Sequence, residues 1–229
     1  MKSLESVAMD VHESKGGDSL SIKLKNGQSA ILRLARPDDA VRIQEMHGRL
    51  SQTSLYFRYL YAYKPKLEDM QLVSQQDDCY GAAFVAVLQD GQDTIIGLGN
   101  YRRDPQQPDI AEPAVIVEDR FQRQGVGSAL LQRLQAHAVS HGIRSYHAII
   151  LPSNNRMRRL VARSGSHYES KYNWEQGVLE VTQPLVANVD KESAAGSQAA
   201  PNPWQPYQPS CEGVSPLRTT TRDYLPAAA

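Results

Sequence analysis

The spacing of apolar residues along the chain predicts both strands and helices. Short segments that alternate apolar with polar residues, or are apolar throughout, have the pattern of strands. They lie at 21–24, 30–34, 82–89, 94–101, 111–117, 146–151, 166–172 and 178–182. Longer segments with apolar residues every three or four positions predict helices at 37–50, 67–73, 126–140 and 154–164. Turn residues at 26–27, 90–91 and 173–177 connect neighbouring strands, so the whole pattern is that of an α+β fold.

The helix predicted at 37–50 begins with Pro37, Asp38 and Asp39, which are residue types that suit a first helical turn. Its predicted apolar face consists of Val41, Ile43, Met46, His47 and Leu50. The segment 51–63 that follows is rich in aromatic residues: Tyr56, Phe57, Tyr59, Tyr61 and Tyr63. These rings could pack a helix against a sheet, or they could line a substrate groove.

Composition divides the chain into a folded region between two polar ends. Residues 1–19 are mostly polar and are expected to form a flexible leader. Residues 20–185 contain all the predicted elements and are expected to form one domain. Residues 186–229 are a tail rich in proline, alanine and serine, and 201–229 alone holds six of the chain's 13 prolines. Such a segment buries too little apolar surface to offset its ordering entropy, so we expect it to be disordered.

Composition also argues against several classes of function. The 25 basic residues balance the 25 acidic ones, so no net field attracts nucleic acid or an anionic membrane. No apolar run has the length of a membrane span or the character of a signal peptide. Cys79 and Cys211 are too few and too far apart for a disulfide framework, and no cysteine and histidine cluster has zinc spacing. We therefore expect a cytoplasmic protein with no metal site.

A glycine-rich segment between a strand and a helix is the main candidate for chemistry. Residues 122–127 read Gln-Arg-Gln-Gly-Val-Gly, after the apolar residues 114–117 and at the start of the helix at 126–140. Glycine lets the backbone approach a ligand closely, and the first turn of a helix offers unpaired N–H groups to an anion. The segment 122–127, which we call the cradle, therefore predicts a site for a pyrophosphate.

The charge around the cradle is one-sided. From position 120 to 165 there is no Asp, Glu or Lys, but there are eight arginines: Arg120, Arg123, Arg133, Arg144, Arg156, Arg158, Arg159 and Arg163. Arginine pairs bidentately with phosphate, which favours a small molecule that carries phosphate as the ligand. Any one of these arginines could instead belong to a solvated helix face.

With the strand at 111–117, the cradle, the strand at 146–151 and Asn154 in this order, the chain resembles the GNAT superfamily of N-acetyltransferases. The cradle matches that family's Gln/Arg-x-x-Gly-x-Gly/Ala motif for acetyl-CoA. Three further segments resemble the acetyltransferase domain of bacterial protein lysine acetyltransferases that modify acyl-CoA synthetases. They are Arg-Pro-Asp-Asp-Ala at 36–40, Leu-Ser-Gln-Thr-Ser-Leu-Tyr-Phe-Arg-Tyr at 50–59 and Ala-Glu-Pro-Ala-Val-Ile-Val at 111–117.

The resemblance implies a mixed, mostly antiparallel central sheet with flanking helices, in which a splayed pair of strands holds acetyl-CoA as co-substrate. The residues that it assigns to acetyl-CoA are Val115, Ile116, Val117, Gln122, Arg123, Gln124, Gly125, Val126, Gly127, Ser128 and Asn154. The N–H of Val115 is the candidate oxyanion donor for the tetrahedral intermediate. Asn154 could also be the N-cap of the helix that it precedes.

Glu112 is the candidate catalytic base. A lysine ammonium has a pKa of about 10.4, so a base must accept its proton before the amine attacks the thioester. The resemblance implies that Glu112 does this directly or through a water; otherwise it is a strand residue that faces solvent or pairs with an arginine. Glu118 and Asp119 are expected to be loop or capping residues. Many family members have a tyrosine that protonates the leaving thiolate, but Val161 stands at its place.

The sequence leaves three functions open. The chain could transfer an acetyl group to a lysine of a protein, such as an acyl-CoA synthetase. It could instead acetylate a small amine such as a polyamine, an amino acid or an aminoglycoside. It could also be a non-catalytic regulatory module that binds acetyl-CoA, although the presence of Glu112 argues against this.

Overall fold

The computed structural model of the chain describes residues 11–13, 19–75, 79–164 and 167–185. These residues belong to two compact units, and the chain passes between them several times. The first unit contains the described residues up to 75, together with 83–100 and 114–133. The second contains 79–82, 101–113 and the described residues from 134 onward. The predicted tail at 186–229 and most of the predicted leader lie outside the described residues.

The first unit contains a sheet whose strands follow one another in the order β1-β2-β3-β4-β5-β6. The strands are β1 (Val11–Glu13), β2 (Ser19–Lys23), β3 (Ser29–Leu34), β4 (Gly81–Leu88), β5 (Ile95–Arg103) and β6 (Ile110–Val117), and the last three also contribute residues to the second unit. Strands β1 to β4 pair antiparallel, and Gly27 has a φ of +89° in the predicted turn between β2 and β3. Strand β1 falls within residues 1–19, the segment that was expected to be a flexible leader.

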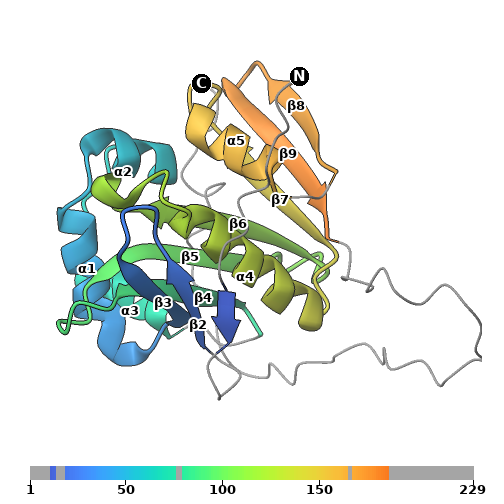
Figure 1. Ribbon diagram of the computed structural model, residues 1–229. Helices are drawn as coiled ribbons and strands as arrows, with labels where there is room; N and C mark the ends of the chain where they lie inside the picture. Colours follow the sequence, from blue (N-terminus) through green and yellow to red (C-terminus); the bar gives the residue numbers. More distant parts are fainter. Residues whose placement is uncertain (1–10, 14–18, 76–78, 165–166, 186–229) are drawn as a thin grey trace, which may run out of the picture. The chain divides into compact units, whose positions relative to one another are not determined.

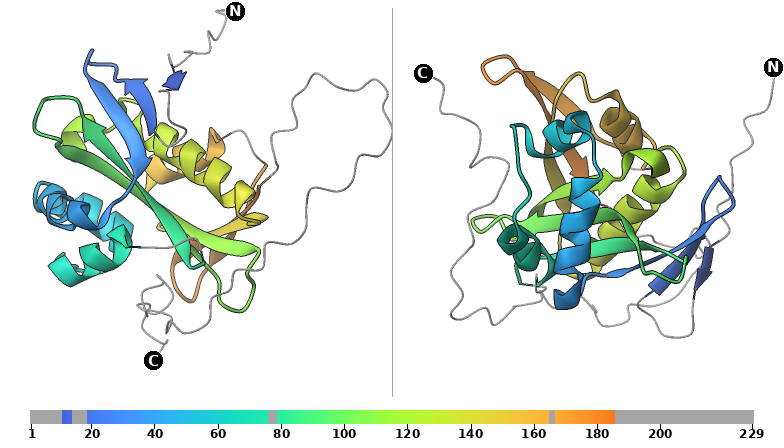
Figure 2. Two further views of the ribbon diagram at one scale, coloured as in Figure 1. Left: turned by 90° about the horizontal axis from the view of Figure 1, so that it is seen from below. Right: turned by 90° about the vertical axis from the view of Figure 1, so that its left-hand side faces the viewer.

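The connection from β3 to β4 is helical and covers one side of the sheet (Figure 2). It consists of η1 (Pro37–Asp39), α1 (Ala40–Gly48), α2 (Gln52–Tyr59) and α3 (Leu67–Ser74). Ile43 and Met46 of α1 are fully buried in one cluster with Val85 of β4. Val41 is 53% exposed, which corrects the predicted apolar face. At about 100° per residue, Val41 lies roughly 200° around the helix from Ile43, so the two side chains cannot share a face.

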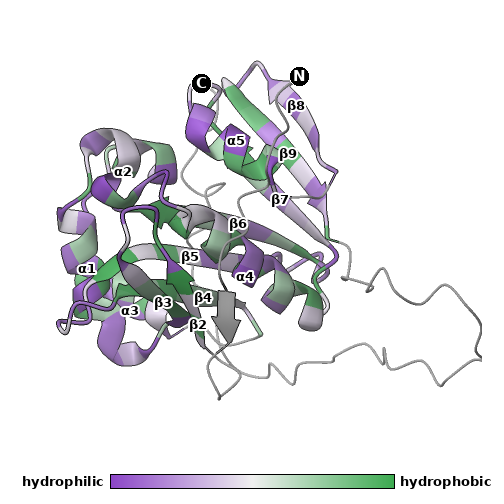
Figure 3. Cartoon of the chain, in the orientation of Figure 1, coloured by the Kyte–Doolittle hydropathy of each residue, from purple (hydrophilic) through white to green (hydrophobic). Residues whose placement is uncertain are grey.

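The second unit continues the strand order as β6-β7-β9-β8 (Figure 1). Its further elements are β7 (Ser145–Ile150), α5 (Asn155–Ala162), β8 (Glu169–Asn173) and β9 (Val178–Pro184). Strand β7 is parallel to β6 and antiparallel to β9, which confirms the predicted mixed, mostly antiparallel sheet. Helix α5 has an apolar side, where Met157 and Val161 pack against Ile150, and an arginine-bearing side, as its mixed colours show (Figure 3).

Two properties of the whole chain can be compared with the expectations from composition. Cys79 is disulfide-bonded, although the sequence separation of the two cysteines had argued against a disulfide framework; Cys211 lies outside the described residues. No helix in the described part of the chain is both long enough and apolar enough to cross a membrane.

Candidate active site

The cradle begins where β6 ends and leads directly into a long helix. After Val117 the chain forms the short helix η2 (Asp119–Phe121), then the cradle, then α4 (Val126–Ser140). Arg123 has a φ of +61° and Gly125 a φ of +101°, both in the left-handed region that most side chains disfavour. Alternation of left-handed residues with ordinary ones turns successive backbone N–H groups toward one concave side, which is a geometry that binds anions.

The first turn of α4 supplies further N–H groups to the cradle. The N–H of Ala129 donates to the carbonyl oxygen of Gly125 at 3.0 Å, which is the first bond of the helical ladder. The N–H groups of Val126, Gly127 and Ser128 precede that bond, so an α-helix offers them no acceptor of its own. Together with the positive end of the helix dipole, these groups favour a phosphate at this end of α4.

A glycine on β5 lets α4 approach the sheet closely. An added side-chain carbon at Gly97 would lie 3.1 Å from Val126 Cγ1 and 3.1 Å from Leu130 Cδ1. Val126 and Leu130 are themselves fully buried. The position of the first two turns of α4, and of the cradle before them, therefore depends on the absence of a side chain at position 97.

Two glutamines that were assigned to acetyl-CoA have side chains engaged within the protein. Gln122 Nε2 donates to the carbonyl oxygen of Val117 at 2.9 Å and to Ser54 Oγ at 3.1 Å. Gln124 Nε2 donates to the carbonyl oxygen of Arg120 at 2.8 Å. These amide nitrogens hold the cradle in shape, and the assignment of both residues to acetyl-CoA stays a prediction.

The end of β6 is fastened to the start of α2 by Asp119. Its carboxylate accepts hydrogen bonds from Ser51 N at 2.8 Å, Ser51 Oγ at 2.9 Å and Ser54 Oγ at 2.8 Å. Ser51 is also the N-cap of α2, because its hydroxyl accepts from Ser54 N. This network agrees with the capping role expected for Asp119. The Ser-x-x-Ser spacing of Ser51 and Ser54 is the sequence signal for the start of α2. Their partner, Asp119, is 65 to 68 residues away and could not be identified from spacing alone.

Glu118 and the first arginine of the basic segment are paired with each other. Glu118 is buried and forms ion pairs with Arg120 and, at 3.0 Å, with Arg49. Arg120 also lies over the ring of Phe121. Arg133, within α4, lies over the ring of Phe84, with 5.6 Å between the guanidinium carbon and the ring centroid. Arg120 and Arg133 therefore have contacts within the protein, whereas Arg123 at the cradle is exposed.

Within the second unit, Glu112 lies on β6 just beyond the residues that pair with β7. The parallel register joins Ile110 to Ser145 and Ala111 to Tyr146. Pro113 follows Glu112 and has no N–H to donate to a sheet ladder. The paired region of β6 and β7 is short for strands of eight and six residues, as is expected for two strands that splay apart. Glu112 is half-buried at this position.

Asn154 and Val161 mark the two ends of α5. Asn154 is buried, and its Oδ1 accepts a hydrogen bond from Met157 N at 3.1 Å, so it is the N-cap of the helix. Its Nδ2 group is the part of the side chain that could serve a ligand. Val161 is buried with Ile150 and Val181 and offers no acid.

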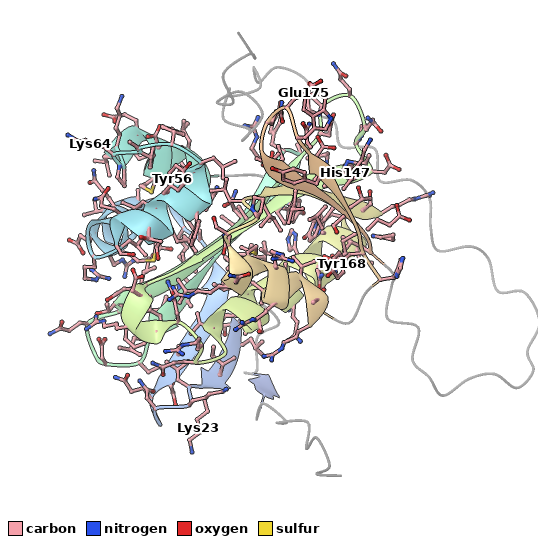
Figure 4. All side chains as sticks on the ribbon, turned by 90° about the horizontal axis from the view of Figure 1, so that it is seen from above. Lys23, Tyr56, Lys64, His147, Tyr168 and Glu175 are labelled. Atoms are coloured by element: carbon pink, nitrogen blue, oxygen red, sulfur yellow. The ribbon has the colours of Figure 1, made fainter. Side chains whose placement is uncertain are left out.

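The aromatic segment after α1 is mostly packed inside the first unit. The rings of Tyr59 and Tyr63 have centroids 3.9 Å apart, and the hydroxyl of Tyr63 donates to Asp69 at 2.6 Å. Burial raises the pKa of Tyr59 to about 12. Tyr56 is the exception at 47% exposure (Figure 4). Packing therefore accounts for Tyr59 and Tyr63, and Tyr56 alone of these three is exposed.

No group of three or more His, Cys, Asp or Glu side chains in the described ranges could hold a metal ion. In the first unit, the cradle offers backbone N–H groups and the exposed side chain of Arg123, which fit an anionic ligand. In the second unit, Glu112 offers a carboxylate that accepts hydrogen bonds, and Asn154 offers its Nδ2 group as a donor.

Comparisons with known proteins agree with this geometry. Residues 50–165, just over half of the chain, match the acetyltransferase (GNAT) family. The chain is 27% identical over 176 residues to the acetyltransferase Pat of Mycolicibacterium smegmatis, which covers 76% of this chain and 51% of that protein. It is 29% identical over 155 residues to an acetyltransferase of Pseudomonas aeruginosa, covering 65% of this chain and 81% of the relative.

Among solved structures, the GNAT domain of S. lividans PAT superposes with a TM-score of 0.66 at 29% identity. The match covers 76% of this chain and the whole of that domain. This chain thus spans about half the length of the Mycolicibacterium relative and the full length of the isolated domain. The family that the cradle motif predicted is confirmed, and the chain belongs to the GNAT family of acetyltransferases.

Proposed function

We propose that this protein transfers the acetyl group of acetyl-CoA to the amine of a lysine side chain in a protein substrate. The observation that carries the proposal is the backbone of the cradle, where Arg123 and Gly125 have positive φ immediately before the first-turn N–H groups of α4. A pyrophosphate is the group of acetyl-CoA that fits such a site. The resemblance of residues 36–40, 50–59 and 111–117 to protein lysine acetyltransferases favours an acceptor of the protein class.

Acetyl-CoA would be held largely by backbone groups. The N–H groups from Arg123 to Ser128 would bind its pyrophosphate, and N–H groups of Val115 and Val117 would bind its pantetheine arm. Ile116, with its buried side chain, would keep this strand in place. The Nδ2 group of Asn154 would donate to a pantetheine carbonyl while Oδ1 continues to cap α5.

Glu112 would act as the general base. It would accept a proton from the lysine ammonium, directly or through a water, and the neutral amine would then form a bond to the acetyl carbonyl carbon. The N–H of Val115 would stabilise the oxyanion that develops. As the carbon–sulfur bond breaks, coenzyme A leaves as a thiolate, and the acetylated lysine loses its second proton to solvent. A thiol of pKa about 8.5 is a good enough leaving group that no acid is required at position 161.

The first test is to titrate the full chain with acetyl-CoA by calorimetry and then measure release of coenzyme A thiol. Two classes of acceptor are compared in the same preparation: an acyl-CoA synthetase, and small amines that include spermidine, free lysine and an aminoglycoside. We expect binding and rapid thiol release with the synthetase. Rapid release with a small amine alone would replace the protein acceptor by the small one, and binding without release would indicate a regulatory module.

The base is tested by Glu112→Gln. We expect acetyl-CoA to bind with its dissociation constant changed by less than about twofold, while kcat/KM at pH 7 falls by about 10² to 10⁴, because only proton removal is lost. Activity should recover in part toward pH 10, where the substrate amine loses its proton unaided. Glu175→Gln, at an exposed turn (Figure 4), is the matched control and should leave both constants unchanged. Full activity of Glu112→Gln at pH 7 would remove Glu112 from this role.

A further inference from the structure

Strand β8 forms the end of the sheet in the second unit (Figure 1). It pairs with β9 on one side, from Glu169 with Thr182 to Asn173 with Val178. Within the described ranges no strand lies on its other side. Every second residue of such an edge strand directs its N–H and C=O groups away from its neighbour, and these groups can pair with a further strand.

The side chains along β8 are mostly exposed. The first four residues of the strand are exposed, and Tyr172 is 54% exposed. From Tyr168 to Tyr172 the sequence reads Tyr-Glu-Ser-Lys-Tyr. Reversal of this segment about Ser170 exchanges one tyrosine for the other and places the acidic residue opposite the basic one. The segment is therefore complementary to itself when it runs antiparallel.

We infer that the edge of β8 binds β8 of a second copy of this chain, antiparallel, with a two-fold axis through Ser170. In this register Ser170 faces Ser170 of the second copy. Glu169 faces Lys171 of the second copy, and Lys171 faces its Glu169. Tyr168 and Tyr172 face each other in the same way, so the pairing contains two opposite-charge pairs and two aromatic pairs. Cross-strand pairs of both kinds stabilise antiparallel sheets.

The faces of the strand support this register. Ser170 and Tyr172 lie on one face because side chains alternate along a strand, and Tyr168, immediately before the strand, continues this alternation. Tyr168 (Figure 4) packs against the apolar cluster of α5 and β9. Tyr172 is paired with Leu179. The aromatic pairs would therefore extend an apolar surface that already exists in the unit. Glu169 and Lys171 lie on the opposite face, where ion pairs remain close to solvent.

Charge favours this register over those in which the two-fold axis passes through an adjacent residue. An axis through Lys171 would place the two Lys171 side chains opposite each other, and an axis through Glu169 would oppose the two Glu169 side chains. Like charges directly opposite destabilise a strand pair. A symmetric pairing that uses each edge once also closes on itself, so it predicts a dimer rather than a fibre.

The experiment measures the dimer dissociation constant of the full chain by sedimentation equilibrium and by light scattering across protein concentration. We expect a monomer–dimer equilibrium for the wild type. Lys171→Glu should raise the dissociation constant by about tenfold or more, because both cross-strand ion pairs become repulsive. Glu169→Lys should do the same. The double charge reversal, Glu169→Lys with Lys171→Glu, restores opposite charges and should return the constant to within about threefold of the wild type.

Lys25→Glu is the control, since it changes the net charge as Lys171→Glu does but lies in an exposed turn of the first unit. It should dimerise as the wild type does. Thermal melting verifies that each variant is folded. A wild type that is monomeric at all concentrations up to about 100 μM, a weak limit for a specific contact, would overturn the inference. So would a Lys171→Glu variant that dimerises normally, or a folded double variant that fails to recover.

Discussion

At the scale of single residues, the sequence predicted whether a side chain is buried more reliably than which residues it contacts. His47 was predicted to belong to an apolar helix face, and it is almost fully buried. Its Nδ1 lies 2.8 Å from the carbonyl oxygen of Ile43, and its Nε2 lies 2.7 Å from the hydroxyl of Tyr59. A carbonyl only accepts, so Nδ1 carries the proton and Tyr59 donates to Nε2. These are the bonds that a neutral histidine makes.

This arrangement predicts a dependence of stability on pH. Burial lowers the pKa of His47 to about 4, and the charge of Arg58 adds to this, although the bond to Ile43 opposes it. In the unfolded chain the pKa is about 6.5, so the unfolded state binds a proton first as the pH falls. Above pH 6.5, His47 is neutral in both states and should not reduce the free energy of unfolding. As the pH falls to 4, proton uptake by the unfolded state should reduce this free energy by about 3 kcal/mol.

His47→Phe tests this dependence by urea denaturation at pH 7, 5.5 and 4.5. The variant should be less stable than the wild type at pH 7, because Tyr59 loses its acceptor, and the difference should shrink as the pH falls. His147→Gln, at an exposed position of β7 (Figure 4), should leave the pH profile unchanged. Parallel profiles for the wild type and His47→Phe would contradict a neutral buried histidine.

At the scale of elements, strands and helices follow from local pattern, but their distances depend on contacts from elsewhere in the chain. The pattern at 126–140 predicted a helix with Ala129, Leu130, Leu134 and Ala138 on one face, and all four are buried. The close packing of this helix on β5 was not predicted. Gly97, the residue that permits it, lies about 30 positions earlier, in a strand whose sequence pattern is otherwise typical. Glycine in a strand can indicate such a close approach.

Gly97→Val should disturb both the fold and the cradle. Its first side-chain carbon would already be 3.1 Å from Val126 and Leu130, so the added methyl groups would force α4 outward. We expect a loss of about 1–3 kcal/mol in the free energy of unfolding, as for other overpacked cores. Acetyl-CoA affinity should fall with it, since the cradle precedes the displaced turn. Urea denaturation and calorimetric titration give the two quantities.

Gly48→Val is the control for this prediction. Gly48 is exposed at the end of α1, and nothing lies within 4 Å of a side-chain carbon placed there. Its stability should change by no more than about 0.5 kcal/mol, as at most surface positions. Wild-type stability and affinity in Gly97→Val would show that α4 does not rest on this contact.

At the scale of the whole molecule, family membership could be concluded from a few short motifs, whereas the acceptor could not. The cradle motif, the strand before it and the following Asn154 gave the GNAT family, which the match over residues 50–165 confirms. The roles of Glu112 and Asn154 toward a substrate stay predictions, as does the lysine acceptor. Acceptor choice depends on side chains that converge from separate segments, and such convergence has no period or fixed spacing in a sequence.

Local patterns alone determined the strands, the helices and the cradle, because these depend on residues within one or two turns of each other. The positive φ at Gly125 and the N-cap role of Asn154 are of this kind. Only the tertiary structure decided which charges are neutralised. Asp39 was expected to complement a helix dipole, but it is buried between Arg33, at 2.6 Å, and Arg42, at 2.8 Å. Burial alone would raise the pKa of Asp39, but bonds from Arg33 and from Arg36 N, with both guanidinium charges, lower it. Charges interact through space over distances that sequence separation does not record, so only the folded chain fixes their partners.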